Sequence, residues 1–249
     1  MKRAVVLTHE DFEGPARIAE ILADEGNSLE VLQLHRGDEV PARLGRDDVL
    51  VVMGGPMGVG DVGDPRYSFL AREVELLRAR VADDAAVLGI CLGAQLLAHA
   101  AGARVAPMTD PRGERVYEVG WGPIRYHAGE GHPEVDRILD GLPEESITLH
   151  WHGDAFELPE GARRLASTPV CPTQGFILGR RLVGLQFHCE TSALDVEAFV
   201  REDAAFVVKA HGEAGVERVS AETPRYLPAF RREGDLLLRN ILRTVSSPR

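Results

Sequence analysis

The chain has 249 residues, 44% of them hydrophobic, so it can bury a sizeable core and is predicted to form one globular unit. A formal net charge of −11 argues against a nucleic-acid-binding surface. No apolar run reaches membrane-spanning length, and the first one is broken at once by charged residues, so neither a membrane span nor a signal peptide is expected. Three cysteines without disulfide-framework spacing favour a reducing compartment, with the cytoplasm as the expected location.

In the first half of the chain, short apolar runs alternate with amphipathic patterns. Strands are expected over residues 4–7, 29–34, 49–53 and 86–90, and helices over residues 15–25, 67–81 and 92–101. This alternation is typical of an α/β protein with a mostly parallel central sheet flanked by helices. Ligands of such sheets bind beyond the carboxyl ends of the strands, where Gly54-Gly55-Pro56 and Cys91 lie.

The second half is richer in short strands and turns, so it is expected to be smaller and partly antiparallel. Strands are predicted over residues 124–126, 147–151, 176–178 and 182–188, followed by helices over 193–210 and 228–245. Ser192, with Asp195 three residues on, is expected to cap the first of these helices. The polar, glycine-containing residues 212–224 predict a loop that leads to a C-terminal helical appendage.

Cys91 is the candidate nucleophile, because it stands where the strand pattern turns into a helix pattern. Gly89 and Gly93, two residues to either side, suit a sharp strand-to-helix turn that crowds neighbouring side chains. A thiol at the start of a helix faces unpaired N–H groups and the positive end of the helix dipole, which favour the thiolate. An isolated cysteine usually fills a core, but this setting favours a nucleophile.

His188 and Glu190 are the candidate base and its orienting group. On an extended strand they project to the same side while Cys189 points away, so Glu190 could fix the imidazole tautomer and leave the other nitrogen facing Cys91. An attacked carbonyl also needs amide donors for its oxyanion. The N–H groups of Gly55 and of Leu92, the residue after the nucleophile, are the candidates.

Together these residues resemble class I glutamine amidotransferases, closest to the amidotransferase domain of GMP synthase and its stand-alone relatives. The resemblance rests on four motifs in the family's order: Gly54-Gly55-Pro56, Gly89-Ile90-Cys91-Leu92-Gly93-Ala94-Gln95, His152-Gly153-Asp154 and Gln186-Phe187-His188-Cys189-Glu190. It implies a flavodoxin-like amidotransferase domain over residues 1–210 with a helical extension over residues 211–249. It also implies that Gly54, Gln95, His152, Gly153 and Asp154 bind substrate.

The resemblance implies that a Cys91-His188-Glu190 triad hydrolyses the glutamine side-chain amide through a γ-glutamyl thioester and releases ammonia. No cofactor is implied. Three alternatives for the role of the chain stay open. It passes ammonia to a separate synthase subunit, it is a γ-glutamyl peptidase, or it is a regulatory subunit with little activity alone. Cys189 stands where the family usually has proline, so we expect a less rigidly held Glu190.

Simpler interpretations account for the remaining candidates. His150 and His152 share a strand face and suggest a metal site, but no further ligands with convincing spacing accompany them, so no metal is expected. Trp121 and Trp151 are expected to pack, and Cys171 to be a bystander thiol. The acidic residues 61–64 are expected to form a solvated loop that could shape the site entrance.

Overall fold

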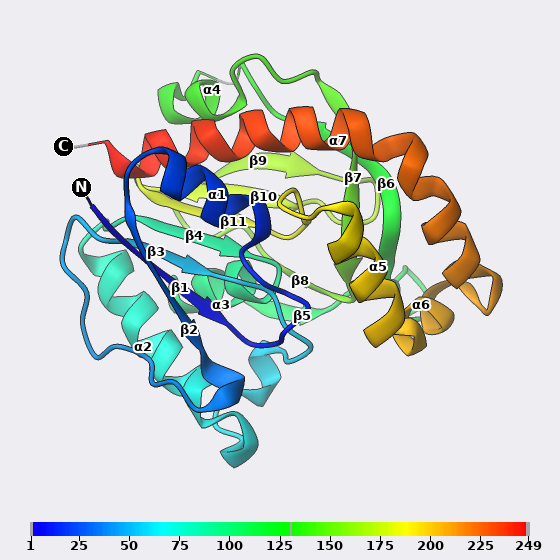
Figure 1. The fold of residues 1–249 in the computed structure, drawn as a ribbon, viewed down its shortest axis with the longest axis horizontal. Helices are drawn as coiled ribbons and strands as arrows, with labels where there is room; N and C mark the ends of the chain where they lie inside the picture. The colour runs from blue at the N-terminus through cyan, green and yellow to red at the C-terminus, as the bar shows by residue number, and fades with distance from the viewer. Residues whose placement is uncertain (1, 130, 248–249) are drawn as a thin grey trace.

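A nine-stranded sheet in the order β2-β1-β3-β4-β11-β10-β9-β6-β7 organises the computed structural model, which describes residues 2–129 and 131–247 (Figure 1). The parallel half consists of β2 (Ser28–Gln33), β1 (Arg3–Thr8), β3 (Val49–Val52), β4 (Val87–Ile90) and β11 (Leu182–Leu185). The antiparallel half consists of β10 (Gly175–Leu178), β9 (Arg163–Ser167), β6 (Glu118–Tyr126) and β7 (Glu145–His152). The predicted fold class, parallel first and partly antiparallel later, is confirmed.

Helices cover both faces of β1, β3, β4 and β11, which is why these four strands are almost continuously apolar, unlike the edge strand β2. On β1, Val5 and Leu7 face α2 (Ser68–Ala82) and α3 (Leu92–Ala100). Ala4 and Val6 face the opposite layer. That layer contains α1 (Ala16–Asp24), α4 (Pro133–Leu139) and the C-terminal half of α7 (Ala214–Ser246).

A third apolar cluster lies beside the antiparallel half. There α5 (Ala193–Glu202), α6 (Ala204–His211) and the first half of α7 pack on β6 and β7 (Figure 1). A two-stranded sheet of β5 (Val105–Pro107) and β8 (Asp154–Phe156) and three 3-10 turns (Leu34–Arg36, Val59–Asp61, Pro65–Tyr67) complete the described elements. No helix in the described ranges is both long and apolar enough to cross a bilayer.

The expected loop over residues 212–224 is wrong, because α7 begins at Ala214 and runs through this segment and beyond. Val219 and Thr223 are buried, and Trp121 Nε1 donates a hydrogen bond to Thr223 Oγ1 at 3.0 Å. Pro224 is accommodated inside the helix. Packing on β6 therefore outweighs the polar composition that suggested a loop.

Among the other boundaries that differ from the prediction, two lie next to the candidate site residues. The helix expected over residues 193–210 is divided at Asp203 into α5 and α6, although its start carries the predicted capping box of Ser192 and Asp195. The strand expected over residues 182–188 ends at Leu185, and His188 instead forms an isolated bridge with Leu149 of β7. The main chain therefore leaves β11 at Leu185, and the candidate base His188 pairs with β7.

Candidate active site

Cys91 lies at a strained turn between β4 and α3. Its backbone has φ 50° and ψ −107°, a conformation that few side chains adopt and that marks functional turns. A Cβ on Gly89 would lie 2.6 Å from the Gly93 carbonyl carbon, and one on Gly93 would lie 2.6 Å from the Val52 carbonyl carbon. Both glycines are therefore required by close backbone approach, as the sequence predicted.

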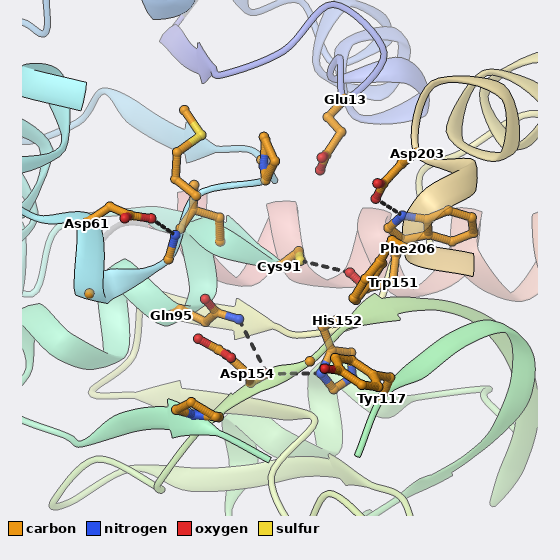
Figure 2. A pocket seen from close by; sticks show the side chains of 18 of the residues that line it. Glu13, Asp61, Cys91, Gln95, Tyr117, Trp151, His152, Asp154, Asp203 and Phe206 are labelled. Carbon is orange, nitrogen blue, oxygen red and sulfur yellow. Dashed lines mark hydrogen bonds between the residues drawn. The ribbon is translucent and has the colours of Figure 1, made fainter. Parts of the chain in front are cut away.

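The Cys91 side chain opens into a cavity of about 480 Å³ at the carboxyl ends of β3 and β4 (Figure 2). Residues from both halves of the chain line it: Glu13, Gly55, Met57, Asp61, Cys91, Leu92, Gln95, Arg115, Tyr117, Trp151, His152, Gly153, Asp154, Asp203, Phe206 and Lys209. Every residue assigned to the oxyanion hole or to substrate binding lies on this cavity except Gly54, which lies behind Gly55 against Glu13 and His188.

His188 and Glu190 form a buried pair, with 2.7 Å between His188 Nδ1 and Glu190 Oε1. Burial lowers the pKa of His188, but the Glu190 carboxylate and Cys91 outweigh it and hold this pKa well above 6.5. His188 Nε2 is not claimed by any other hydrogen bond among the described residues, and Cys91 is close enough to this ring to raise its pKa.

The start of a helix was expected to favour the Cys91 thiolate, but burial of the thiol outweighs this effect. Burial raises the pKa of this thiol, while His188 and the Leu92 N–H act to lower it. Contact with His188 is therefore the largest effect that favours the thiolate.

Because this chain lacks the family's proline, a loosely held Glu190 carboxylate was expected. The backbone of Cys189 instead holds this carboxylate firmly. The N–H of Cys189 donates a hydrogen bond to Glu190 Oε2 at 2.8 Å, a contact that proline cannot make. Burial raises the pKa of the Cys189 thiol well above its usual 9.0, so this second thiol stays protonated.

Cys189→Ala is expected to leave kcat within about twofold, because alanine keeps the N–H donor. Cys189→Pro is expected to lower the free energy of unfolding by about 1.5–3 kcal/mol, the usual value of a hydrogen bond to a charged group. Urea denaturation and steady-state kinetics measure both. Equal stability of the two variants would contradict a role for the N–H.

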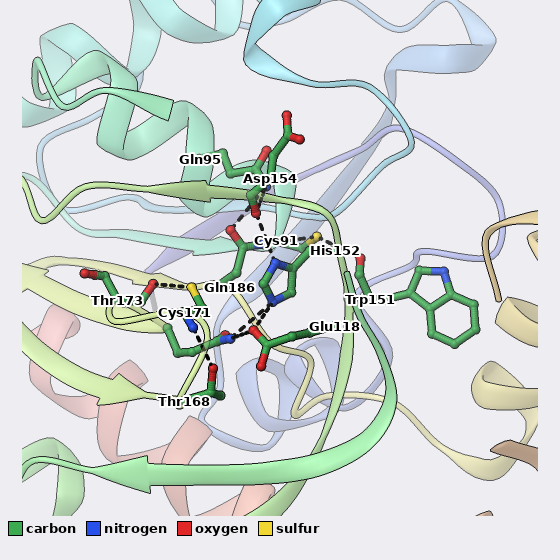
Figure 3. Close-up of polar contacts among 11 residues, drawn as sticks. Cys91, Gln95, Glu118, Trp151, His152, Asp154, Thr168, Cys171, Thr173 and Gln186 are labelled. Atoms are coloured by element: carbon green, nitrogen blue, oxygen red, sulfur yellow. Dashed lines mark hydrogen bonds and ion pairs between the residues drawn. The ribbon is translucent and has the colours of Figure 1, made fainter. Parts of the chain in front are cut away.

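A hydrogen-bond network connects the thiol to the predicted substrate residues (Figure 3). Gln186 Nε2 donates to Cys91 Sγ at 3.6 Å, and Gln95 Nε2 donates to Gln186 Oε1 at 3.1 Å. The ring of His152 is oriented by the Asp154 carbonyl, 3.0 Å from Nδ1. Gln186 was recognised only as part of a motif, and its contacts with the thiol depend on the tertiary fold.

Glu118 joins this network from β6, a contact that sequence spacing did not indicate. Its Oε2 lies 3.3 Å from His152 Nε2 and accepts a hydrogen bond from Gln174 Nε2 at 2.6 Å. The ligand atoms of Glu118, His150 and His152 lie within 4.8 Å of one another, a spacing that could hold a metal ion. The predicted lack of further ligands near the two histidines is therefore wrong.

Glu13 is a buried carboxylate that no sequence pattern indicated. A Cβ on Gly54 would lie 3.2 Å from Glu13 Cδ and 3.3 Å from His188 Cε1, so both side chains face this glycine. Burial raises the pKa of Glu13 to about 7, although His188 and His9 act to lower it. No sequence motif marks this residue, because its position beside His188 is set by the fold.

Glu13→Gln is expected to remove part of the pH dependence of stability. Because the pKa of Glu13 rises from 4.5 to about 7 on folding, the folded state binds its proton more tightly, and stability falls as the pH rises through this window. The variant should gain about 2 kcal/mol relative to the wild type between pH 5 and pH 8, measured by urea denaturation. The exposed Glu160→Gln is the control, and a pH-independent difference for Glu13→Gln would contradict the prediction.

The remaining candidates lie where their simpler interpretation predicted. Trp151 packs edge-on against Phe199, although its ring also borders the cavity and its Nε1 donates to Asp203 at 2.9 Å. Trp121 packs against Phe230. Cys171 is buried away from the cavity, and Asp61 borders the cavity as the acidic-loop prediction allowed.

A thiol at a strained turn, beside an imidazole held by a carboxylate, is the arrangement typical of thiol hydrolases and transferases. The family model described as "Glutamine amidotransferase class-I" matches residues 15–203. The chain therefore belongs to the class I glutamine amidotransferase family.

Named relatives agree with this assignment. The chain is 29% identical over 221 residues to the glutamine amidotransferase-like protein YfeJ of Salmonella typhimurium, covering 88% of each chain. It is 32% identical over 148 residues to GMP synthase of Acinetobacter baylyi, covering 57% of this chain and only 23% of the synthase.

Solved structures show the same fold over nearly the whole chain. A glutamine amidotransferase from Methylobacillus flagellatus superimposes with a TM-score of 0.81 at 25% identity and covers 98% of this chain and 95% of its own. One from Thermotoga maritima has a TM-score of 0.78 at 25% identity and covers 99% of both chains.

Proposed function

We propose that the chain hydrolyses the side-chain amide of glutamine, or of a related γ-glutamyl compound, with Cys91 as nucleophile, His188 as base and Glu190 as the group that orients the base. The observation that carries this proposal is a thiol that opens into a cavity beside a buried imidazole whose other nitrogen is bound to a carboxylate. Family membership supports the same reaction.

In the first half-reaction, His188 Nε2 takes the thiol proton and the sulfur adds to the amide carbon. The N–H groups of Gly55 and Leu92 stabilise the oxyanion of the tetrahedral intermediate. Collapse of this intermediate breaks the C–N bond, and His188 returns the proton to the nitrogen as ammonia leaves. The product is a γ-glutamyl thioester on Cys91.

In the second half-reaction, His188 removes a proton from water, and the resulting hydroxide attacks the thioester. Collapse releases glutamate and restores the thiol. Among the residues that line the cavity, Asp154 and Asp203 offer anions and Arg115 and Lys209 offer cations, which suits the zwitterionic end of a free amino acid. Gln95 and the segment 152–154 add polar contacts for the same end.

The extent of the matches to known relatives supports a proposal for the fate of the ammonia. YfeJ is matched along most of both chains, whereas the GMP synthases extend far beyond the matched region. We propose that the ammonia passes to a separate synthase subunit, with direct γ-glutamyl peptidase activity as the alternative. A subunit with little activity alone would release ammonia rapidly only after its partner is added.

A substrate screen tests the proposal. Purified protein is supplied with glutamine and with a set of γ-glutamyl amides and peptides, and ammonia and glutamate are measured in parallel. Equal amounts of both products from glutamine support the amidotransferase reaction. Cleavage of γ-glutamyl peptides alone supports the peptidase, and no turnover of any of these compounds, with or without a candidate synthase, would contradict the proposal.

Metal-dependent hydrolysis is a second candidate, favoured by the cluster of Glu118, His150 and His152. The thiol reaction needs no ion, so a chelator is expected to leave ammonia release unchanged, and elemental analysis is expected to find only substoichiometric metal. Loss of activity in chelator, with recovery on adding Zn²⁺, would favour the metal reaction instead. In the same experiment, Glu118→Gln shows whether Glu118 acts as a metal ligand or only as a hydrogen-bond acceptor, because glutamine keeps an acceptor oxygen but loses the negative charge that favours a metal ion.

A further inference from the structure

His9, at the end of β1, is a buried histidine whose two ring nitrogens are both hydrogen-bonded. Its Nδ1 lies 2.8 Å from the Gly54 carbonyl oxygen. Its Nε2 lies 3.0 and 3.1 Å from the two carboxylate oxygens of Glu73, on α2. Neither His9 nor Glu73 has any exposed side-chain surface, and neither borders the cavity.

Both partners of this ring are acceptors, so both ring nitrogens donate and the ring is an imidazolium. Burial alone would lower the pKa of His9, but Glu73, the Gly54 carbonyl and Glu13 reverse this effect and raise it. The Phe69 ring, 5.9 Å away between centroids, closes the α2 side. An ion pair in such a setting has few alternative partners, so its geometry is tightly determined.

We propose that the His9–Glu73 pair fixes the direction of the Gly54–Gly55 peptide and thereby aims the Gly55 N–H at the reacting carbonyl. The peptide is trans, so its C=O and N–H point in opposite directions. His9 does not line the cavity, so the Gly54 oxygen that it binds points away from the cavity, and we infer that the Gly55 N–H points toward it. This inference rests on the proposed function, because the N–H matters only if an oxyanion forms there.

The peptide needs such a restraint because glycine stands on both sides of it. Two adjacent glycines allow the peptide plane to rotate with little steric cost. Both glycines are nevertheless required: Gly54 faces Glu13 and His188, and a Cβ on Gly55 would lie 2.9 Å from His9 Cβ. His9 therefore acts as a positioning residue that supplies the rigidity which the two glycines lack.

Two double variants test the proposal without leaving a buried unpaired charge. His9→Leu with Glu73→Leu removes the donor, and kcat for ammonia release is expected to fall by about 10²–10³-fold, with KM within a few-fold. His9→Asn with Glu73→Leu places an amide Nδ2 where the ring Nδ1 was, and at least about tenfold of this loss should return. Thermal unfolding shows whether each variant is folded.

A second readout separates the oxyanion from the nucleophile. Alkylation of Cys91 by iodoacetamide displaces iodide at saturated carbon and builds no oxyanion, so its rate is expected to be unchanged in the His9→Leu, Glu73→Leu protein. A purely structural effect on the site would slow alkylation and hydrolysis together. Nitrogen NMR of the wild-type ring should also find both nitrogens protonated at neutral pH.

The outcomes distinguish this inference from the proposed function. Unchanged kcat in the folded leucine variant, or an equal fall in its alkylation rate, overturns the positioning role alone. A singly protonated His9 ring overturns the imidazolium. Full activity of Cys91→Ala overturns the proposed function and this inference together.

Discussion

Cys91→Ala is expected to lower ammonia release from the protein's best amide substrate by at least about 10⁴-fold, because the proposed reaction loses the atom that would form the thioester. The turn itself should remain, since its strained backbone is held by the close approach of Gly89 and Gly93 to neighbouring main chain and not by the thiol. Measurement of ammonia and glutamate, with circular dichroism to confirm folding, checks this result.

Cys171→Ala is the matched control. Cys171 is also buried, its pKa is raised to about 12 by burial, and its Sγ contacts only the Thr173 carbonyl at 3.5 Å among the hydrogen bonds of the described residues. This variant should keep wild-type kcat. Comparable losses in both variants would mean that the effect comes from packing, and full activity in Cys91→Ala would remove the nucleophile assignment.

The parallel half of the fold could be predicted because its signals are local. A strand buried on both faces is a continuous apolar run, so β1, β3 and β4 are each found within one or two residues of the expected bounds. The first half of α7 could not be predicted in this way. Its stability comes from burial of Val219 and Thr223 against distant strands, which no local pattern reports.

The candidate site shows the same contrast between residues that local motifs reveal and residues that only the tertiary fold brings together. Cys91 and the segment 186–190 carry their chemistry in adjacent residues, so short motifs reveal them. The meeting of His188 with Glu190 was expected from strand alternation, yet His188 lies beyond the end of β11, in an isolated bridge to β7. Glu13 and Glu73 were not anticipated, because single carboxylates become informative only when folding buries them.

Gly93→Ala is expected to destabilise the protein by about 3 kcal/mol or more, or to prevent folding, with the smallest possible change of side chain. The added Cβ would lie 2.6 Å from the Val52 carbonyl carbon and 2.9 Å from Val52 Cβ, on the buried strand β3. Neither neighbour is the end of a flexible side chain, so α3 must move away from the sheet. Because α3 begins beside Cys91, the same movement displaces the nucleophile and the Leu92 N–H.

Gly60→Ala separates this steric effect from the general effect of replacing glycine, because a Cβ at residue 60 would meet nothing within 4 Å. Its free energy of unfolding in urea should lie within about 0.5 kcal/mol of the wild type. If Gly93→Ala is equally stable and active, the contact between α3 and β3 is looser than the structure describes, and the strained turn at Cys91 does not depend on it. If the variant folds but loses kcat alone, the crowding at this glycine serves mainly to place the thiol and only secondarily to stabilise the sheet.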